Sequence, residues 1–210
     1  MIEILCFGDS NTWGYSPSRP GRLPRDVRWT GVLQRELGAG FFVTEDGQSG
    51  RTTVWDDPVE GGCKNGKTYL IPCLEAHKPL DVVVLLLGTN DLKGRFSVNA
   101  FDIASSAGIL LDVIAKSGAG PDGKSPKVLL IAPPPLGKLT WFAEMFQGGR
   151  DKSLLLAERF RTAAKDHGVE FLDAGEVIRS SDLDGIHFEE GEHEKLGKAV
   201  AARLKKMVGA

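Results

Sequence analysis

The chain has 210 residues, of which 41% are hydrophobic and 26% charged, and its formal net charge is −2. This length and balance predict one globular domain over residues 1–210 and exclude a disordered chain. They give no electrostatic reason to expect binding to nucleic acid or to an anionic membrane. The longest apolar run, residues 82–87, is far shorter than the ~20 residues of a spanning helix, so no membrane segment is expected.

The N-terminal residues and the cysteines indicate a compartment. Residues 1–7 include an early acidic residue, Glu3, and no basic stretch, so we expect no signal peptide and a cytoplasmic protein. The three cysteines are odd in number and show no C-x-x-C spacing, which predicts neither a zinc site nor a disulfide framework. Only Cys63 and Cys73 could form a disulfide, and we do not expect one.

Short apolar runs predict the strands. Residues 2–7, 82–87 and 128–131 are rich in leucine or β-branched side chains and are bounded by turn or polar residues, as in strands buried on both faces of a parallel sheet. Two shorter strands are predicted at residues 41–44 and 169–172.

Helical spacing of apolar residues predicts the remaining elements. The predicted helices cover residues 29–37, 68–77, 101–116, 152–167 and 190–207. In the fourth of these, Leu154, Leu155, Phe160 and Ala164 fall on the apolar side. Strands and helices alternate, which is typical of an α/β fold with a mostly parallel five-stranded sheet and helices on both faces.

Polar segments follow the predicted strands. Ligands of such sheets bind beyond the carboxyl ends of the strands, so these segments should meet at one edge. They are residues 8–11 (Gly-Asp-Ser-Asn), 47–51 (Gly-Gln-Ser-Gly-Arg), 88–91 (Gly-Thr-Asn-Asp), 132–135 (Ala-Pro-Pro-Pro) and 184–187 (Asp-Gly-Ile-His).

Ser10 is the candidate nucleophile, because its place directly after a buried strand would hold its hydroxyl rigidly at this edge. A serine hydroxyl is a weak nucleophile at neutral pH and needs a base within hydrogen-bond reach, itself oriented by a third group. Gly-Asp-Ser after a strand is also an ordinary turn and helix-capping signal. The tripeptide alone therefore leaves both interpretations open.

Asp184 and His187 are three residues apart, so one turn of chain can bring the carboxylate to one imidazole nitrogen and leave the other nitrogen facing Ser10. The alternative is a tight Asp-Gly turn beside a structural histidine. The other histidines are poorer bases, because two lie near predicted helix ends and one lies in a charged helical stretch. They are His77, His167 and His193.

Acyl transfer also needs donors aimed at the oxyanion that forms on the carbonyl, and loss of one typically costs about 10²–10³ in rate. The candidates are the backbone N–H groups of Ser10 and Gly50 and the side-chain amide of Asn90. Taken alone, Gly50 is an ordinary loop glycine and Asn90 is equally a helix cap. The order and placement of all these elements together favour the catalytic interpretation.

The same segments resemble the four blocks of the SGNH (GDSL-like) hydrolase superfamily, in the right chain order and across nearly the whole chain. The resemblance implies a flavodoxin-like three-layer α/β/α sandwich. It also implies an oxyanion hole formed by Ser10, Gly50 and Asn90, and a catalytic triad completed by Asp184 and His187.

Residues 5–14, 26–33 and 86–91, together with Phe188 after the histidine, look like the bacterial arylesterase subgroup, which includes an acyltransferase and perhydrolase. Members act on short acyl esters, including acetyl esters of aryl alcohols and carbohydrates, and several assemble into oligomers. The resemblance therefore implies a small-molecule ester as substrate and a homo-oligomer. The acyltransferase has leucine at the position of Asn11 and alanine at that of Gly50, and we expect Asn11 to make the pocket more polar and less suited to transfer.

Other enzyme folds are excluded by their missing motifs. The nucleophile elbow of α/β-hydrolases reads G-x-S-x-G, whereas Thr12 stands where its second glycine should be. No G-x-G-x-x-G follows the first strand and no G-K-[ST] phosphate loop is present, which excludes Rossmann and P-loop enzymes.

Apolar residues near the predicted site are candidates for substrate binding. One cluster follows the proline run and consists of Trp141, Phe142, Met145 and Phe146. Its spacing also suits a buried helix face or a subunit contact. Other candidates lie beside the predicted triad and are Asn11, Tyr15 and Ile186. We expect Asp9 and Asp91 to hold loops through backbone N–H groups. Arg51 could contact the substrate, but a lone arginine in a loop is usually solvated, and we expect that here.

Two classes of function follow. The leading prediction is a serine esterase that forms an acyl-enzyme on Ser10 without metal or organic cofactor. Its expected substrates are acetyl and other short-chain esters of aryl alcohols, alkyl alcohols or sugars, with possible acyl transfer to an alcohol or peroxide. The alternative is a non-catalytic flavodoxin-like binding protein, although such a protein has no use for a general base beside a serine.

Overall fold

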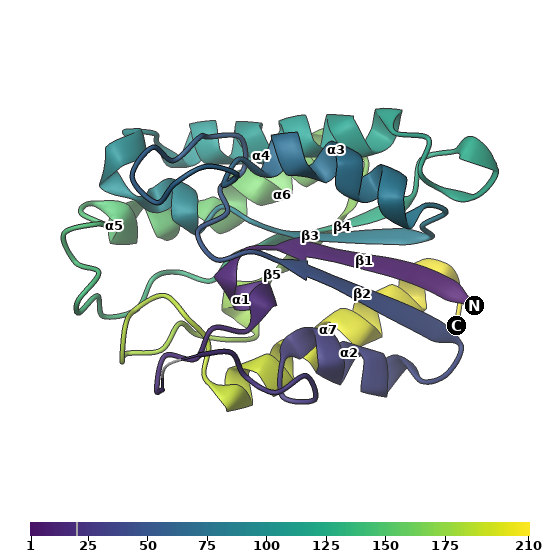
Figure 1. Ribbon diagram of the computed structural model, residues 1–210, viewed down its shortest axis with the longest axis horizontal. Helices are drawn as coiled ribbons and strands as arrows, with labels where there is room; N and C mark the ends of the chain where they lie inside the picture. Colours follow the sequence, from purple (N-terminus) through teal and green to yellow (C-terminus); the bar gives the residue numbers. More distant parts are fainter. Residues whose placement is uncertain (20) are drawn as a thin grey trace.

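The computed structural model describes residues 1–19 and 21–210 and contains a five-stranded sheet in which all pairings are parallel (Figure 1). The strands are β1 (Ile2–Gly8), β2 (Phe41–Gly47), β3 (Val82–Leu86), β4 (Lys127–Ala132) and β5 (Glu170–Asp173). Their order across the sheet is β2-β1-β3-β4-β5. This is the flavodoxin-like order, which reverses direction between β1 and β3. The predicted α/β class and topology are confirmed.

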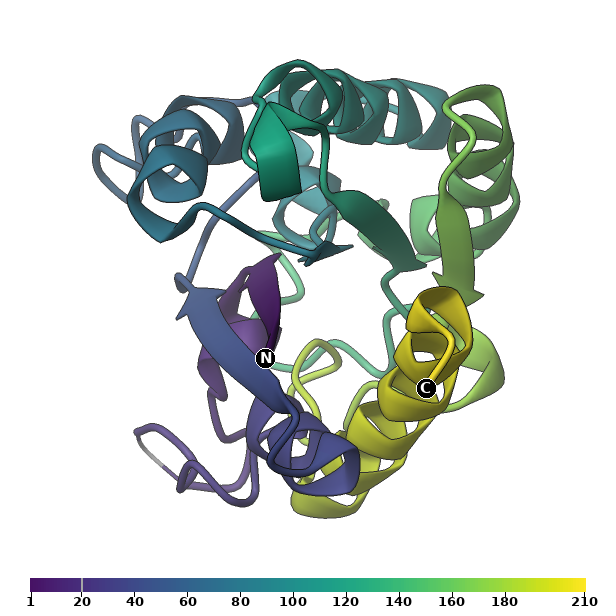
Figure 2. The same cartoon turned by 90° about the vertical axis from the view of Figure 1, so that its right-hand side faces the viewer.

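Helices cover both faces of the sheet, which gives three layers (Figures 1 and 2). One face carries α2 (Trp29–Leu37) and α7 (Glu190–Val208), and the other carries α3 (Gly66–His77), α4 (Ala100–Lys116) and α6 (Leu156–Asp166). The shorter helices are α1 (Ser10–Trp13), α5 (Gly149–Ser153), η1 (Asn90–Leu92), η2 (Gly94–Phe96), η3 (Pro121–Gly123) and η4 (Ala174–Glu176). Among the described residues, no helix is both long and apolar enough to span a bilayer.

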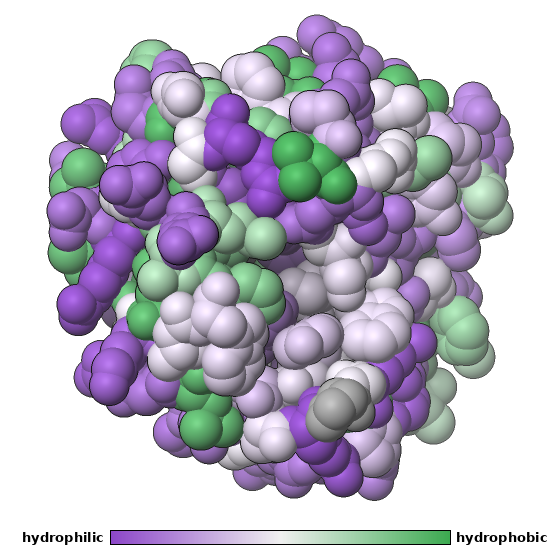
Figure 3. All heavy atoms as spheres, turned by 60° about the vertical axis from the view of Figure 1, so that its left-hand side comes forward, coloured by the Kyte–Doolittle hydropathy of each residue, from purple (hydrophilic) through white to green (hydrophobic). Residues whose placement is uncertain are grey.

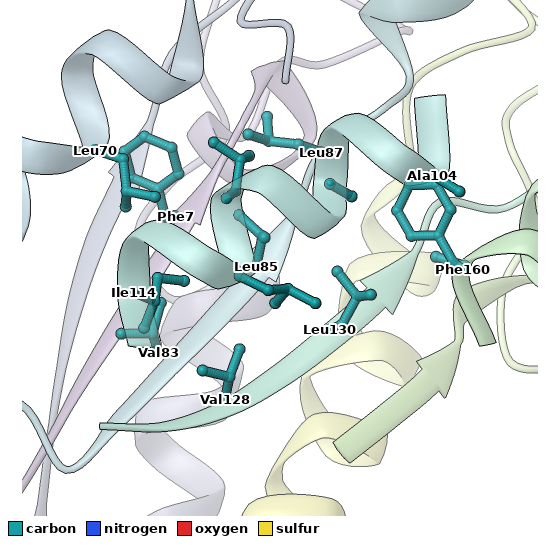
Figure 4. Close-up of a cluster of buried hydrophobic side chains, with 14 of the residues drawn as sticks. Phe7, Leu70, Val83, Leu85, Leu87, Ala104, Ile114, Val128, Leu130 and Phe160 are labelled. Carbon is teal, nitrogen blue, oxygen red and sulfur yellow. The ribbon is translucent and has the colours of Figure 1, made fainter. Parts of the chain in front are cut away.

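The central strands supply both hydrophobic cores. Successive side chains of a strand point to opposite faces, so Val83 and Leu85 of β3 join the core under α4, whereas Val82 and Val84 join the core under α2 and α7. Figure 4 shows the first of these cores, with Phe160 of α6 packed at its edge. This division explains why β3 is apolar at every position, as strands buried on both faces must be.

The predicted helix over residues 152–167 is wrong at its beginning, because the chain forms α5 and α6 with a break between them. The hydroxyl of Ser153 donates to the carbonyl oxygen of Arg150 over 2.6 Å, a local bond that competes with the regular helix pattern. Leu154 and Leu155 are 63% and 51% exposed instead of buried. All three cysteines of the described chain are free.

α2 and α7 pack closely at Gly197, where an added Cβ would lie 2.6 Å from Val32 Cβ and 2.7 Å from the carbonyl oxygen of Trp29. His193, one turn earlier on α7, is buried rather than part of a charged surface. Its Nδ1 accepts the Trp29 N–H over 3.2 Å at the start of α2. Burial lowers the pKa of His193 to about 4, so the ring stays neutral and able to accept this bond.

We expect Gly197→Ala to lower the free energy of unfolding by about 1–3 kcal/mol, because the added methyl overpacks the α2–α7 contact. Gly191→Ala is the matched control, since it makes the same change on the same helix where nothing lies within 4 Å. It should leave stability unchanged or slightly raised. Urea denaturation of both variants measures the difference, and equal stabilities would contradict the packing account.

Candidate active site

Ser10 begins α1 directly after β1, at the carboxyl edge of the sheet. The preceding residue, Asp9, caps this helix, and its Oδ1 accepts the Asn11 N–H over 2.9 Å. Asp9 therefore holds the loop through a backbone N–H, as predicted. Burial raises the pKa of Asp9 to about 6. The serine is 6% exposed, so its surroundings restrict access of solvent to the hydroxyl.

A chain of hydrogen bonds joins Ser10 to two residues from the other end of the sequence. His187 Nε2 lies 2.9 Å from Ser10 Oγ, and His187 Nδ1 lies 2.7 Å from Asp184 Oδ2. All three side chains are buried. This arrangement satisfies the geometric requirement for moving the serine proton to an oriented histidine.

The second carboxylate oxygen of Asp184 fixes the turn that carries the histidine. Its Oδ1 accepts the N–H of Ile186 over 2.8 Å and that of His187 over 2.9 Å. Burial raises the pKa of Asp184, but the hydrogen bonds from these two residues and the His187 charge outweigh it and hold the pKa below its ordinary value. The carboxylate therefore remains ionised beside the imidazole.

Gly50 and Asn90 line the same pocket as Ser10. Gly50 has φ of +81°, a backbone conformation that favours glycine. Asn90 Nδ2 donates to the carbonyl oxygen of Arg51 over 3.0 Å. An amide nitrogen carries two protons, so this bond fixes the plane of the Asn90 amide and uses one of them.

Arg51 is buried, and its predicted solvation is wrong. Its Nη1 donates to the carbonyl oxygens of Gly8 and Asp46, each over 2.8 Å, and its Nη2 pairs with Asp46 Oδ1 over 2.8 Å. The guanidinium carbon also lies 4.1 Å from the ring centroid of Phe7, within reach of a cation–π interaction. A lone arginine in a loop gives no sequence signal for such contacts.

Asp91, next to Asn90, is buried and holds the loop that follows Gly50, as predicted. Its two carboxylate oxygens accept the backbone N–H of Thr53 over 3.2 and 3.1 Å, and one also accepts the Thr53 hydroxyl. Burial raises the pKa of Asp91 to about 6. The buried carboxyl thus ties the β3 loop to the β2 loop.

A pocket of about 130 Å³ opens beside Ser10 and His187. Figure 3 turns this edge of the sheet forward and shows the face hollowed near its centre. The apolar lining residues are Tyr15, Phe142, Met145, Phe146 and Ile186. The polar lining residues are Ser10, Ser49, Gly50, Glu60, Asn90, Lys93 and His187. Tyr15 and Phe142 also pack against the imidazole, with ring centroids 4.2 and 6.1 Å from that of His187.

Two predicted pocket residues do not line it. Trp141 is 64% exposed, and its ring packs beside that of Phe142 at the protein surface. Asn11 is buried, and its amide donates to the Ile186 carbonyl oxygen over 3.4 Å. Asn11 therefore contacts the turn that carries His187 and does not make the pocket more polar.

Glu60 and Lys93 are pocket residues that the sequence did not indicate. Both lie in irregular loops, where no periodicity predicts which way a side chain points. Within residues 1–19 and 21–210, no group of three or more His, Cys, Asp and Glu side chains is arranged to hold a metal ion.

Known proteins resemble this chain in sequence and structure. The model of the GDSL-like lipase/acylhydrolase family matches residues 6–193. The aryl esterase of M. smegmatis is 43% identical with a TM-score of 0.94, over 98% of this chain and 99% of that chain. A carbohydrate acetylesterase from Sinorhizobium meliloti is 40% identical with a TM-score of 0.94, over 99% and 100% of the two chains. No curated protein matches the chain in sequence.

A second S. meliloti structure, of a carbohydrate acetylesterase family member, is 34% identical with a TM-score of 0.95 over 100% of both chains. The family match and these full-length similarities agree with one another. The chain belongs to the GDSL-like lipase/acylhydrolase family.

Proposed function

We propose that this protein is a serine esterase that hydrolyses short-chain carboxylic esters through an acyl-enzyme on Ser10. The observation that carries the proposal is the chain of hydrogen bonds from Asp184 through His187 to Ser10, at 2.7 and 2.9 Å. The similarity to an aryl esterase and to carbohydrate acetylesterases supports it.

The geometry assigns each triad residue one role. Ser10 Oγ attacks the ester carbonyl carbon while His187 Nε2 takes the hydroxyl proton, and the same nitrogen then returns that proton to the departing alcohol oxygen. Asp184 holds the ring so that Nε2 faces the serine, and its negative charge stabilises the imidazolium that forms. A water molecule activated by His187 then releases the carboxylic acid from Ser10.

The oxyanion is expected to be bound by the backbone N–H groups of Ser10 and Gly50 and by the second amide proton of Asn90. Such donors act best when their positions are fixed before the reaction begins. The bond from Asn90 to the Arg51 carbonyl supports this role, because it orients the amide without consuming both of its protons.

The pocket supports a short acyl group. Its volume of about 130 Å³ is small beside the roughly 300–1,000 Å³ of sites that hold drug-sized ligands. An acyl chain is apolar, so we assign it to the wall formed by Phe142, Met145 and Phe146. The alcohol part then lies toward the polar wall.

Other features remain predictions. Acyl transfer to an alcohol or to peroxide would compete with hydrolysis at the same acyl-enzyme. The resemblance to the arylesterase subgroup supports assembly into a homo-oligomer, and the N-terminal residues support a cytoplasmic location.

Ser10→Ala should reduce hydrolysis of p-nitrophenyl acetate by on the order of 10⁴-fold or more, because it removes the nucleophile. Ser49→Ala is the matched control. Ser49 lines the same pocket, but within the described part of the chain the hydrogen bond to His187 Nε2 comes from Ser10 and not from Ser49. It should retain most of the activity. Unchanged turnover in a folded Ser10→Ala protein would contradict the mechanism and would favour a binding protein with another role.

Acyl length tests the apolar wall. We expect kcat/KM for p-nitrophenyl esters to be highest from acetyl to butyryl and to fall by octanoyl, because added methylenes find no room. Burial of one methylene would contribute ~0.8 kcal/mol, which is about fourfold in kcat/KM, and each methylene beyond the pocket loses this contribution. Met145→Ala should extend the accepted length, whereas Trp141→Ala should not, because Trp141 lies outside the pocket. Better rates on octanoyl esters in the unmodified protein would indicate an open groove.

A further inference from the structure

The polar wall of the pocket contains an ion pair that the proposed triad and oxyanion hole do not use. Glu60 and Lys93 both line the pocket with Ser10 and His187. Glu60 Oε1 accepts a hydrogen bond from Lys93 Nζ over 2.5 Å. The lysine side chain is 2% exposed, whereas that of Glu60 is 29% exposed. The carboxylate therefore reaches the pocket from a buried support.

Two more charged residues, Asp57 and Arg95, hold Lys93 and Glu60 in place. Asp57 is fully buried, and its carboxylate lies 2.9 Å from Arg95 Nη1 and 3.7 Å from Lys93 Nζ. Burial raises the pKa of Asp57, but the N–H groups of Glu60 and Val59 and the two cations outweigh it and keep the pKa below its ordinary value. The two cations and two carboxylates balance, so the cluster carries no net charge.

A buried ion pair seldom stabilises a fold more than apolar residues of similar volume would, so its presence at a pocket wall calls for another explanation. The network fixes Glu60 Oε1 and leaves the other oxygen of the same carboxylate, Oε2, free. Oε2 makes no hydrogen bond with any described residue, and it lies 2.3 Å from the place that a Cβ on Gly50 would occupy. The free oxygen is thus held against Gly50, in the pocket that Ser10 and His187 also line.

We propose that Glu60 Oε2 accepts a hydrogen bond from a hydroxyl group in the alcohol part of the substrate. Glu60 is then a specificity-determining residue that favours esters whose alcohol part keeps a free hydroxyl near the ester. This inference rests on the proposed esterase function. A carboxylate oxygen only accepts, so it selects O–H donors over ethers and plain alkyl or aryl groups, and charge-assisted bonds of this kind are the strong ones.

A matched pair of esters measures this selection. Glycerol 1-acetate offers hydroxyl donors, and its 2,3-di-O-methyl ether keeps the oxygens and removes the donors. We expect kcat/KM to favour the hydroxyl ester by about 10- to 100-fold, the range that a hydrogen bond to a charged group contributes. Glu60→Gln should abolish most of this preference, because an amide whose oxygen pairs with Lys93 presents N–H groups to the pocket.

Glu75→Gln is the control, because it removes the same charge from an exposed position on α3 and should keep the preference. If Glu60→Gln proves inactive, Glu60→Asp replaces it. The aspartate keeps a negative charge for Lys93, but its side chain is one methylene shorter, so the preference for the hydroxyl ester should also decrease. Equal rates on the two esters in the unmodified protein, or an undiminished preference in the Glu60 variants, would overturn the inference. Failure of the unmodified protein to hydrolyse p-nitrophenyl acetate would instead overturn the proposed esterase function.

Discussion

The guanidinium of Arg51 connects the segments on which the candidate site depends. It binds the carbonyl oxygen of Gly8, two residues before Ser10, and both the carbonyl and the carboxylate of Asp46, at the end of β2. Its own backbone carbonyl accepts the amide of Asn90. One residue therefore connects the loops that carry the proposed nucleophile and the proposed oxyanion donors. Together with the Asp91–Thr53 bonds, these contacts align three strand ends beyond what the sheet register provides.

The carboxyl edge of the sheet holds several buried carboxyl side chains. Asp9 and Asp91 are buried carboxyls that each hold a loop, and burial raises the pKa of both to about 6. Asp184 is buried as well, yet its partners lower its pKa. Taking such groups out of water costs free energy, so their concentration here is expected where geometry must be fixed in advance of a reaction. The apolar cores on the two faces of the sheet offset that cost.

Much of the fold and the meeting of Ser10, Asp184 and His187 could be predicted from the sequence, because both depend on local patterns. The apolar runs identified all five strands, and Ser10, Asn90, Asp184 and His187 each follow a recognisable turn or strand end. Parallel strands bring such ends to one edge, which is why residues 177 positions apart lie within hydrogen-bond distance.

The pocket walls could not be predicted, because they come from irregular loops without periodicity. Trp141 and Phe142 are neighbours in sequence, yet only Phe142 faces the pocket. The burial of Arg51 and Lys93 depends on carboxylates that other loops supply. Likewise, the break between α5 and α6 lies beside the Ser153 hydroxyl, whose bond to a backbone carbonyl a helical pattern does not reveal.

Ser10, Gly50 and Asn90 are proposed to bind the reacting carbonyl together, beside His187. A crystal structure of the protein after reaction with diethyl p-nitrophenyl phosphate tests it most directly. We expect phosphorus bonded to Ser10 Oγ, with the phosphoryl oxygen roughly 2.7–3.1 Å from the backbone nitrogens of Ser10 and Gly50 and from Asn90 Nδ2. Phosphorus on another residue, or a phosphoryl oxygen turned away from Gly50 and Asn90, would contradict it.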